Sequence, residues 1–254
     1  MKKLIRHCTA IFVSCLMVPA AVGQSRNIVE VRTIAVSPYG IIDDDQQSGI
    51  YFDTANILIA EAGYEASNQI YPYARIIKEL KTGQTDMTIM FRYPELEDHV
   101  TFIAPLPALK TVVIGIQGST FDSVESLEGK TIAYLRGGKF SHEIDSHPEI
   151  IRYDTNDFFE GIRLLIAGRV DAIIGPLTPI ISAAEQAGHD EQLFGTPLIV
   201  DQRIPWVQIS NQSKNRISTQ KLKAAFESMV RRGELDRLRQ KYVGKRRINR
   251  LESR

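Results

Sequence analysis

The feature that most constrains the fold of this chain is a pattern that occurs twice. An apolar run at 33–36 leads into turn-forming residues at 37–40, and a similar run at 131–134 leads into a glycine-rich turn at 136–138. Each half then repeats one spacing, in which a Leu is followed by a Gly three residues later and an Asp three residues after that. The residues are Leu80, Gly83 and Asp86 in the first half and Leu165, Gly168 and Asp171 in the second. Because Gly suits the left-handed position that ends a helix, both halves are predicted to alternate buried strands with helices, the α/β class.

Two such halves predict two lobes, each a mostly parallel sheet flanked by helices, with ligands bound at the carboxyl ends of the strands. Two helix-poor segments, 107–118 and 196–210, separate the second half from its flanks and are expected to connect the lobes. The predicted organisation is a first part of lobe 1 at 24–111, lobe 2 at 112–204, a return to lobe 1 at 205–244 and a basic tail at 245–254.

Helix boundaries are readable in two places. Asp157, followed by Glu160 three residues later, predicts a capping pair at a helix start. Near the C-terminus Gly233 is expected to interrupt a helical stretch. The apolar stripe before that interruption is predicted to consist of Leu222, Phe226, Met229 and Val230.

The N-terminus predicts export to the periplasm. Three basic residues precede an apolar stretch at 8–22 that ends on small residues, a pattern typical of a secretory signal peptide at 1–23 cut near Gln24. A membrane anchor is the alternative, but the stretch is interrupted and shorter than the ~20 residues a spanning helix needs. Lipid attachment at Cys15 is a second alternative. Cys8 and Cys15 both lie in this stretch, so the mature chain would hold no disulfide or thiolate metal site.

Composition excludes several classes of protein. The chain is 43% hydrophobic and 24% charged with a net charge of +1, which is an ordinary globular profile. Proteins that bind nucleic acid usually carry a strongly basic face, so no nucleic-acid partner is expected.

Several short segments, taken in order, resemble the family 3 extracellular solute-binding proteins, the periplasmic components of polar amino-acid ABC importers. The likeness runs from about Val31 to Gly244 and is carried by residues 51–53, 74–86, 93–102, 126–131, 168–172 and 233–244. The resemblance implies a two-lobed periplasmic-binding-protein fold of type II with a two-strand hinge, acting as a monomer without a cofactor. It also implies a small-molecule ligand and, as partner, the permease of an ABC importer.

Two departures from the family concern the ligand. The family's amino-acid members hold the ligand carboxylate with an Arg that follows a Pro-Glu pair, and this chain has Leu96 at that place. They hold the ligand ammonium with an acid, and this chain has Pro176 near that position instead. Arg92, four residues before Leu96, is expected to serve an anionic group instead. A buried ammonium without an acceptor is costly, which favours a small anionic ligand, with amino acids as the alternative.

Two further groups of residues are candidates for ligand contact. The loop Arg136, Gly137, Gly138 and Lys139 matches the place where the family offers backbone N–H groups to an anion, and glycines next to a helix start suit that role. An ordinary turn with solvated cations is the alternative. The aromatic and basic candidates around the expected cleft are Tyr39, Tyr71, Tyr73, Arg75 and Trp206. The alternative is that these side chains pack in the core or lie on the surface.

Signals for catalysis or metal binding are weak. His142 and His147 are five residues apart and would diverge on a helix, so no metal site is expected. The mature chain also lacks a Gly-x-Ser-x-Gly elbow, and no enzymatic activity is expected. The alternatives to transport are a dehydratase-like periplasmic enzyme on the same fold and a ligand-sensing module for a separate signalling partner.

Overall fold

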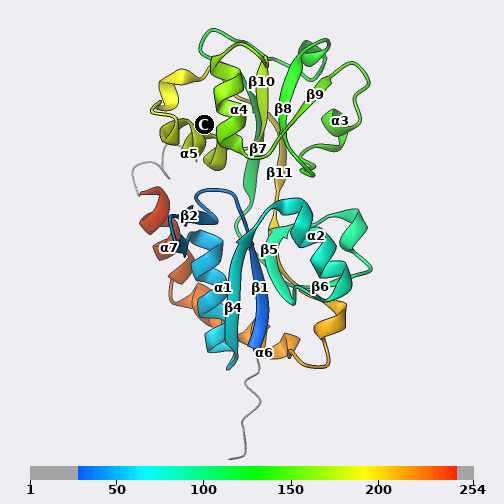
Figure 1. Cartoon of the computed structure of the whole chain (residues 1–254), viewed down its shortest axis with the longest axis vertical. Coiled ribbons are helices and arrows are strands. Elements are labelled where there is room, and N and C mark those ends of the chain that lie inside the picture. The colour runs from blue at the N-terminus through cyan, green and yellow to red at the C-terminus, as the bar shows by residue number, and fades with distance from the viewer. Residues whose placement is uncertain (1–27, 245–254) are drawn as a thin grey trace, which may run out of the picture.

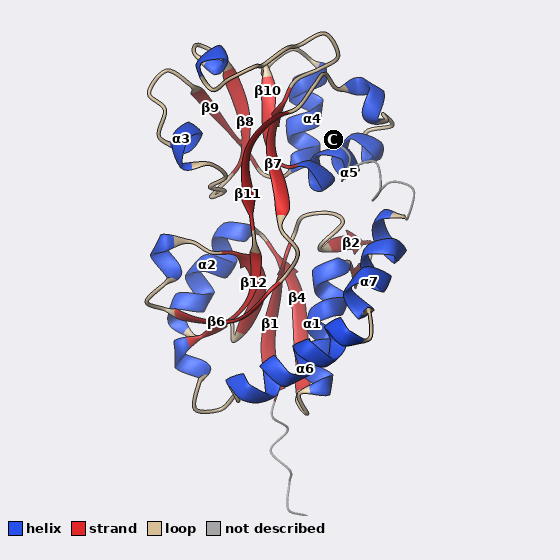
Figure 2. Cartoon of the chain, turned by 180° about the vertical axis from the view of Figure 1, so that it is seen from behind, coloured by secondary structure: helices blue, strands red, loops and turns tan. Residues whose placement is uncertain are grey.

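The computed structural model describes residues 28–244, which form two lobes, one above the other (Figure 1). The sheet of lobe 1 has the order β4 (Glu65–Tyr71), β1 (Ile28–Ile34), β5 (Met87–Phe91), β12 (Pro205–Ser210) and β6 (Val100–Pro105). The sheet of lobe 2 has the order β11 (Leu198–Arg203), β7 (Leu109–Ile114), β10 (Ala172–Pro176), β8 (Thr131–Leu135) and β9 (Ile151–Thr155). The chain passes between the lobes twice, from β6 to β7 and from β11 to β12 (Figure 2).

Helices flank both sheets, as the α/β prediction requires. Lobe 1 carries α1 (Ile50–Glu61), α2 (Tyr73–Thr82), α6 (Thr219–Arg231), α7 (Glu234–Val243) and a hairpin of β2 (Ile41–Asp43) and β3 (Gln46–Ser48). Lobe 2 carries α3 (His142–Asp145), α4 (Phe158–Ile166) and α5 (Leu177–Gln186). Short 3-10 turns lie at Pro94–Leu96, Glu125–Leu127, Glu191–Leu193 and Asn211–Ser213. Within 28–244, no helix has both the length and the apolar content that crossing a membrane demands.

The two sheets share one strand arrangement. Parallel pairing joins β4, β1 and β5 in lobe 1 and β9, β8 and β10 in lobe 2. One strand in each sheet, β12 in lobe 1 and β7 in lobe 2, is antiparallel to both of its neighbours, so it runs against the other four. Each lobe is therefore a mostly parallel sheet, and the carboxyl ends of β1, β5, β8 and β10 face the other lobe.

The repeated spacing of the sequence corresponds to a repeated structural unit, β1-α1-β4-α2-β5 in lobe 1 and β8-α3-β9-α4-β10 in lobe 2. Gly83 ends α2 at φ 74°, and Gly168 follows α4 at φ 64°, so both occupy the left-handed region predicted for them.

The Asp of each repeat ties the lobe together. The Oδ2 atom of Asp86 accepts a hydrogen bond from the backbone N–H of Glu30 at 2.7 Å, and that of Asp171 accepts one from Thr131 at the same distance. Each carboxylate thus joins the loop before β5 or β10 to the strand that opens the repeated unit, β1 or β8. The spacing recurs in the sequence because the contact recurs in the fold.

Buried apolar faces hold the helices on the sheets, with one difference from prediction. The Asp157 side chain accepts a hydrogen bond from the Glu160 N–H at 2.7 Å, which confirms the predicted cap. The apolar face of α6 buries Leu222, Phe226 and Met229, but Val230 is 49% exposed. At 100° per residue Val230 lies about 80° around the helix from Leu222, so it falls at the edge of the buried face.

Candidate ligand-binding site

A small cavity lies between the lobes, at the carboxyl ends of their strands. It measures about 30 Å³. Lobe 1 lines it with Ile34, Val36, Tyr39, Tyr51, Tyr73, Met90, Phe91 and Pro205, and lobe 2 lines it with Leu109, Leu135, Gly138, Phe140, Phe158, Pro176 and Pro179. Since both lobes supply its walls, its size and shape depend on how far the lobes are closed.

Aromatic rings dominate these walls. The rings of Tyr39 and Tyr51 are stacked with their centroids 4.3 Å apart, and those of Phe140 and Phe158 lie 6.4 Å apart on the opposite lobe. No Asp, Glu, Lys, Arg or His is among the described residues that line the cavity. Its surface is therefore apolar apart from the tyrosine hydroxyls and a few backbone groups.

The hydroxyls of Tyr39 and Tyr73 are neutral, and each makes a hydrogen bond with another side chain. Burial raises the pKa of Tyr39, whose hydroxyl bonds to the Thr178 side chain of lobe 2. Burial likewise raises the pKa of Tyr73 and of Tyr93, and the Tyr73 hydroxyl donates to that of Tyr93 at 2.5 Å. Two guanidinium groups, those of Arg203 and Arg239, act on these tyrosines electrostatically from the rim.

Polar contacts join the lobes around the cavity. Arg203, the last residue of β11, donates hydrogen bonds to the backbone oxygen of Arg92 in lobe 1, at 2.7 Å, and to that of Lys139 in lobe 2. Its guanidinium also packs over the Phe91 ring, 4.6 Å from the centroid. The Lys139 ammonium lies 3.4 Å from Glu95 of lobe 1.

Across the cleft, the hydroxyl oxygens of Ser37 and Ser182 are 2.9 Å apart, and they add a contact between lobe 1 and α5. Together with the contacts of Arg203, this pair joins the two lobes.

The glycine loop predicted as an anion site lies at the junction of the lobes. Gly138 lines the cavity. Gly137, at φ 77°, faces α2, and a Cβ added to Gly137 would lie 3.5 Å from the Ala74 Cβ. Arg136 is exposed, and its backbone N–H bonds to the Thr155 oxygen. The helix expected to support this loop is α3, which has only four residues and begins at His142, so its dipole is weak.

Two other candidates, Arg92 and Trp206, lie together on lobe 1 away from the cavity lining. The Arg92 guanidinium packs over the Phe102 ring at 4.2 Å and pairs with Glu97 at 3.2 Å. Trp206 packs edge-on against the same Phe102 ring. A ligand role for Arg92, Trp206, Arg136 and Lys139 stays a prediction.

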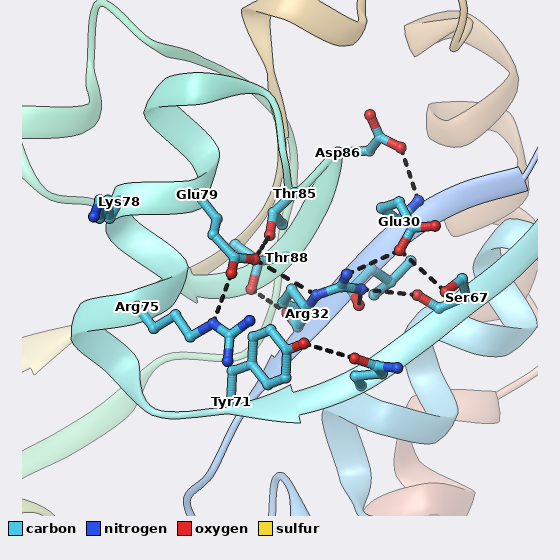
Figure 3. A network of polar contacts seen from close by, with 12 residues as sticks. Glu30, Arg32, Ser67, Tyr71, Arg75, Lys78, Glu79, Thr85, Asp86 and Thr88 are labelled. Carbon is cyan, nitrogen blue, oxygen red and sulfur yellow. Dashed lines mark hydrogen bonds and ion pairs between the residues drawn. The ribbon is translucent and has the colours of Figure 1, made fainter.

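The remaining candidates, Tyr71 and Arg75, belong to a polar network between β1, β4 and α2 of lobe 1 (Figure 3). Arg75 packs over the Tyr71 ring at 3.6 Å and donates from Nε to Glu79 at 2.7 Å. Glu79 is 8% exposed and also accepts a hydrogen bond from Thr85 at 2.9 Å. Although burial alone would raise it, the pKa of Glu79 is lowered by these two donors. In this structure Arg75 therefore compensates a buried carboxylate.

Sequence reasoning missed most of the cavity wall. Met90 and Phe91 stand at the carboxyl end of β5, the position where the strand rule predicts ligand contacts, so a signal for them existed. Tyr51 begins the segment 51–53 that carries the family likeness. Phe140, Phe158 and Arg203 had no such signal, because only the meeting of the lobes brings them to the cavity.

The histidine motif has no metal geometry. His147 lies 3.9 Å from Glu128, and within 28–244 no three or more His, Cys, Asp or Glu side chains cluster in a way that would hold a metal ion.

Two α/β lobes joined by two passages of the chain, with a cavity between facing strand ends, define the class of two-lobed solute-binding proteins. Residues 31–245 match the family model of the bacterial extracellular solute-binding proteins, family 3, and the chain belongs to this family. This confirms the resemblance drawn from the sequence.

Individual relatives are distant. The chain is 23% identical over 228 residues to the probable amino-acid-binding protein YxeM of Bacillus subtilis (strain 168), covering 86% of this chain and 85% of the relative. A mutant of ArgBP from T. maritima superposes with a TM-score of 0.74 at 18% identity, covering 87% of this chain and 97% of the other. The GluR0 ligand-binding core from Nostoc punctiforme, in complex with L-glutamate, superposes with a TM-score of 0.73 at 18% identity, covering 85% and 100%.

Proposed function

We propose that this protein captures a small anionic or amino-acid-like solute in the periplasm and presents it to the membrane permease of an ABC importer. The observation that carries the proposal is the cavity between the lobes, whose walls come from the carboxyl ends of strands in both sheets. The name of the Bacillus subtilis relative and the arginine-binding and glutamate-bound structural neighbours support an amino-acid-like ligand.

Binding is proposed to work by hinge closure. The only chain segments between the sheets are residues 106–108 and Ile204, within the described residues, so rotation there would separate the lobes. A cavity of about 30 Å³ admits an amino-acid-sized solute only if the lobes first move apart. A solute that touches both lobes then favours the closed state, because the open state offers it only one of its two contact surfaces. Ile204 coincides with the proposed lobe boundary at 204, whereas residues 106–108 lie just before the boundary proposed at 111.

We further propose that the protein binds its solute without transforming it. The cavity presents neutral tyrosine hydroxyls and apolar side chains, which suit binding better than acid–base or nucleophilic chemistry. A sensing role for a separate signalling partner is the second candidate function, because it would use the same cavity between the lobes.

The experiment that tests the proposal is native mass spectrometry of freshly purified protein, followed by a thermal-shift screen of small solutes. A co-purified solute, or one that stabilises the protein saturably, is the expected result, since a ligand at 100 times its Kd adds about 2.7 kcal/mol to stability. The absence of any bound mass, together with no stabilisation across amino acids, organic acids and sugars, would contradict solute binding. Recovery of a chemically altered solute would favour the enzyme.

A further inference from the structure

The walls of the cavity restrict the chemistry of what it can hold. A charged ligand group that is buried without a partner costs several kcal/mol, and the lining residues within 28–244 include no charged side chain. The hydroxyls of Tyr39 and Tyr73 each make one hydrogen bond already, with Thr178 and Tyr93, and a neutral hydroxyl compensates a full charge less well than a carboxylate or guanidinium does. The part of a solute that lies inside the cavity is therefore an uncharged, apolar group, which the stacked Tyr39 and Tyr51 rings would face.

Two guanidinium groups act on the tyrosines of the cavity, whereas the nearby carboxylates of Glu95 and Asp157 pair with Lys139 and cap α4, respectively. Arg203 lies over Phe91, and its hydrogen bonds go to two carbonyl oxygens, which carry only partial negative charge. Arg239 acts electrostatically on Tyr39 and Tyr51 from the other side. A carboxylate at the edge of the cavity would meet this positive field favourably, whereas an ammonium would be repelled.

From these two observations we infer that the cavity selects a small hydrophobic carboxylic acid, with a branched aliphatic or aromatic body, over the amino acid with the same side chain. The inference rests on the proposed solute-binding function and narrows its ligand class. Arg203 is the residue assigned to the carboxylate, because it borders the cavity at Phe91 and bridges both lobes.

Matched ligands test the inference by isothermal titration calorimetry on the mature protein. The pairs are 3-phenylpropionate with L-phenylalanine and 4-methylpentanoate with L-leucine, because the members of each pair differ by one ammonium group. At least one acid is expected to bind about tenfold or more tightly than its partner, since the ammonium lacks an acceptor. L-arginine, L-glutamate and 2-phenylethylamine are expected not to bind measurably.

A variant of Arg203 separates contact with the carboxylate from closure of the lobes. Arg203→Gln is expected to weaken the better acid about tenfold while leaving its neutral alcohol, 3-phenylpropan-1-ol or 4-methylpentan-1-ol, within about twofold. Equal losses for acid and alcohol would show that Arg203 acts only on closure and would overturn its assignment. The matched control is Arg232→Gln, an arginine of lobe 1 that pairs with Glu61 and does not line the cavity, and it is expected to change neither ligand; loss of acid binding in this control alone would also overturn the assignment.

Failure of the inference is distinguishable from failure of the proposed function. Tighter binding of L-phenylalanine, L-leucine or a charged amino acid than of the acids would overturn the inference and leave solute binding standing. So would binding of only an unrelated solute in the broader screen. If no solute of any class bound, both would fall.

Discussion

Asp86 and Asp171 make the same contact in the two lobes, each accepting a hydrogen bond at 2.7 Å from the strand that opens its repeated unit, β1 or β8. Beyond that contact their surroundings differ. Asp86 is 1% exposed and also accepts hydrogen bonds from Ser213 and Arg216, both at 2.5 Å, whereas Asp171 is exposed. The same hydrogen bond is thus made in a buried site by Asp86 and in an exposed site by Asp171, so each residue is a control for the other.

We expect Asp86→Asn to destabilise the protein more than Asp171→Asn. The first change weakens charge-assisted bonds to three donors in a buried site and is expected to cost about 3 kcal/mol, and the second weakens one solvated bond at a cost of about 1 kcal/mol. Urea unfolding followed by circular dichroism measures both. Equal losses would show that burial of Asp86 adds nothing to the shared contact.

The lowered pKa of Glu79 predicts a pH-dependent contribution to stability. Because the pKa in the folded state lies below the unfolded value of about 4.3, the carboxylate stabilises the fold above that pH, and the contribution disappears as the pH falls through the folded pKa. The stability difference between wild type and Glu79→Gln is therefore expected to be larger at pH 7 than at pH 3. Urea unfolding at a series of pH values measures it, and a difference independent of pH would contradict the prediction.

The same network offers a partner variant. Arg75→Gln removes a donor to Glu79 and is expected to raise the pKa of Glu79, which NMR titration of the carboxyl carbon reports. The control is Lys78→Gln on the same helix, since Lys78 points away from Glu79 (Figure 3).

Like charges introduced at Ser37 and Ser182 are expected to hold the lobes apart. Their oxygens are 2.9 Å apart in the closed arrangement, so two carboxylates there would repel each other strongly. The double variant Ser37→Asp with Ser182→Asp is expected to lose at least about tenfold in solute affinity beyond the sum of the single variants, and to show a larger radius of gyration by small-angle scattering. Additive single effects with unchanged scattering would argue against closure across this contact.

Export is expected to remove the N-terminal segment, which lies outside the described residues. The protein recovered from the envelope fraction of expressing cells should begin near Gln24, as the basic and apolar pattern of residues 1–23 predicts. Intact-mass measurement determines the new N-terminus. Recovery of a chain starting at Met1 in the membrane fraction would support an anchor instead, and a lipid-modified chain starting at Cys15 would support the lipoprotein alternative.

The fold could be predicted from the sequence because its signals are local. A glycine that ends a helix and an Asp three residues later, as at Gly83 and Asp86, act within one turn of chain and one neighbouring strand. The prediction failed for Val230, where the apolar spacing alone does not say how wide the buried face is.

Much less of the site could be predicted, because it is made by the meeting of two lobes. Tyr39 and Gly138 lie in the loops that follow β1 and β8, so the rule that ligands bind at the carboxyl ends of strands predicted both residues. The cationic candidates were chosen for their charge. Charge alone does not reveal that Arg75 faces Glu79 or that Arg92 packs on Phe102. Which charges border the cavity depends on contacts between residues more than a hundred positions apart, such as Arg203 with Arg92.

The insertion of β12 between β5 and β6 has a consequence for how the chain folds. Every strand of lobe 2 lies between Leu109 and Arg203, so this lobe is complete as soon as that continuous stretch is available. The sheet of lobe 1 stays divided until Pro205–Ser210 arrives to fill its gap, more than a hundred residues after β5. Loop closure over that distance is slow relative to local pairing. A chain emerging from a ribosome or a translocation channel will therefore assemble lobe 2 first, and lobe 1 will close around its last strand only when almost the entire chain has emerged.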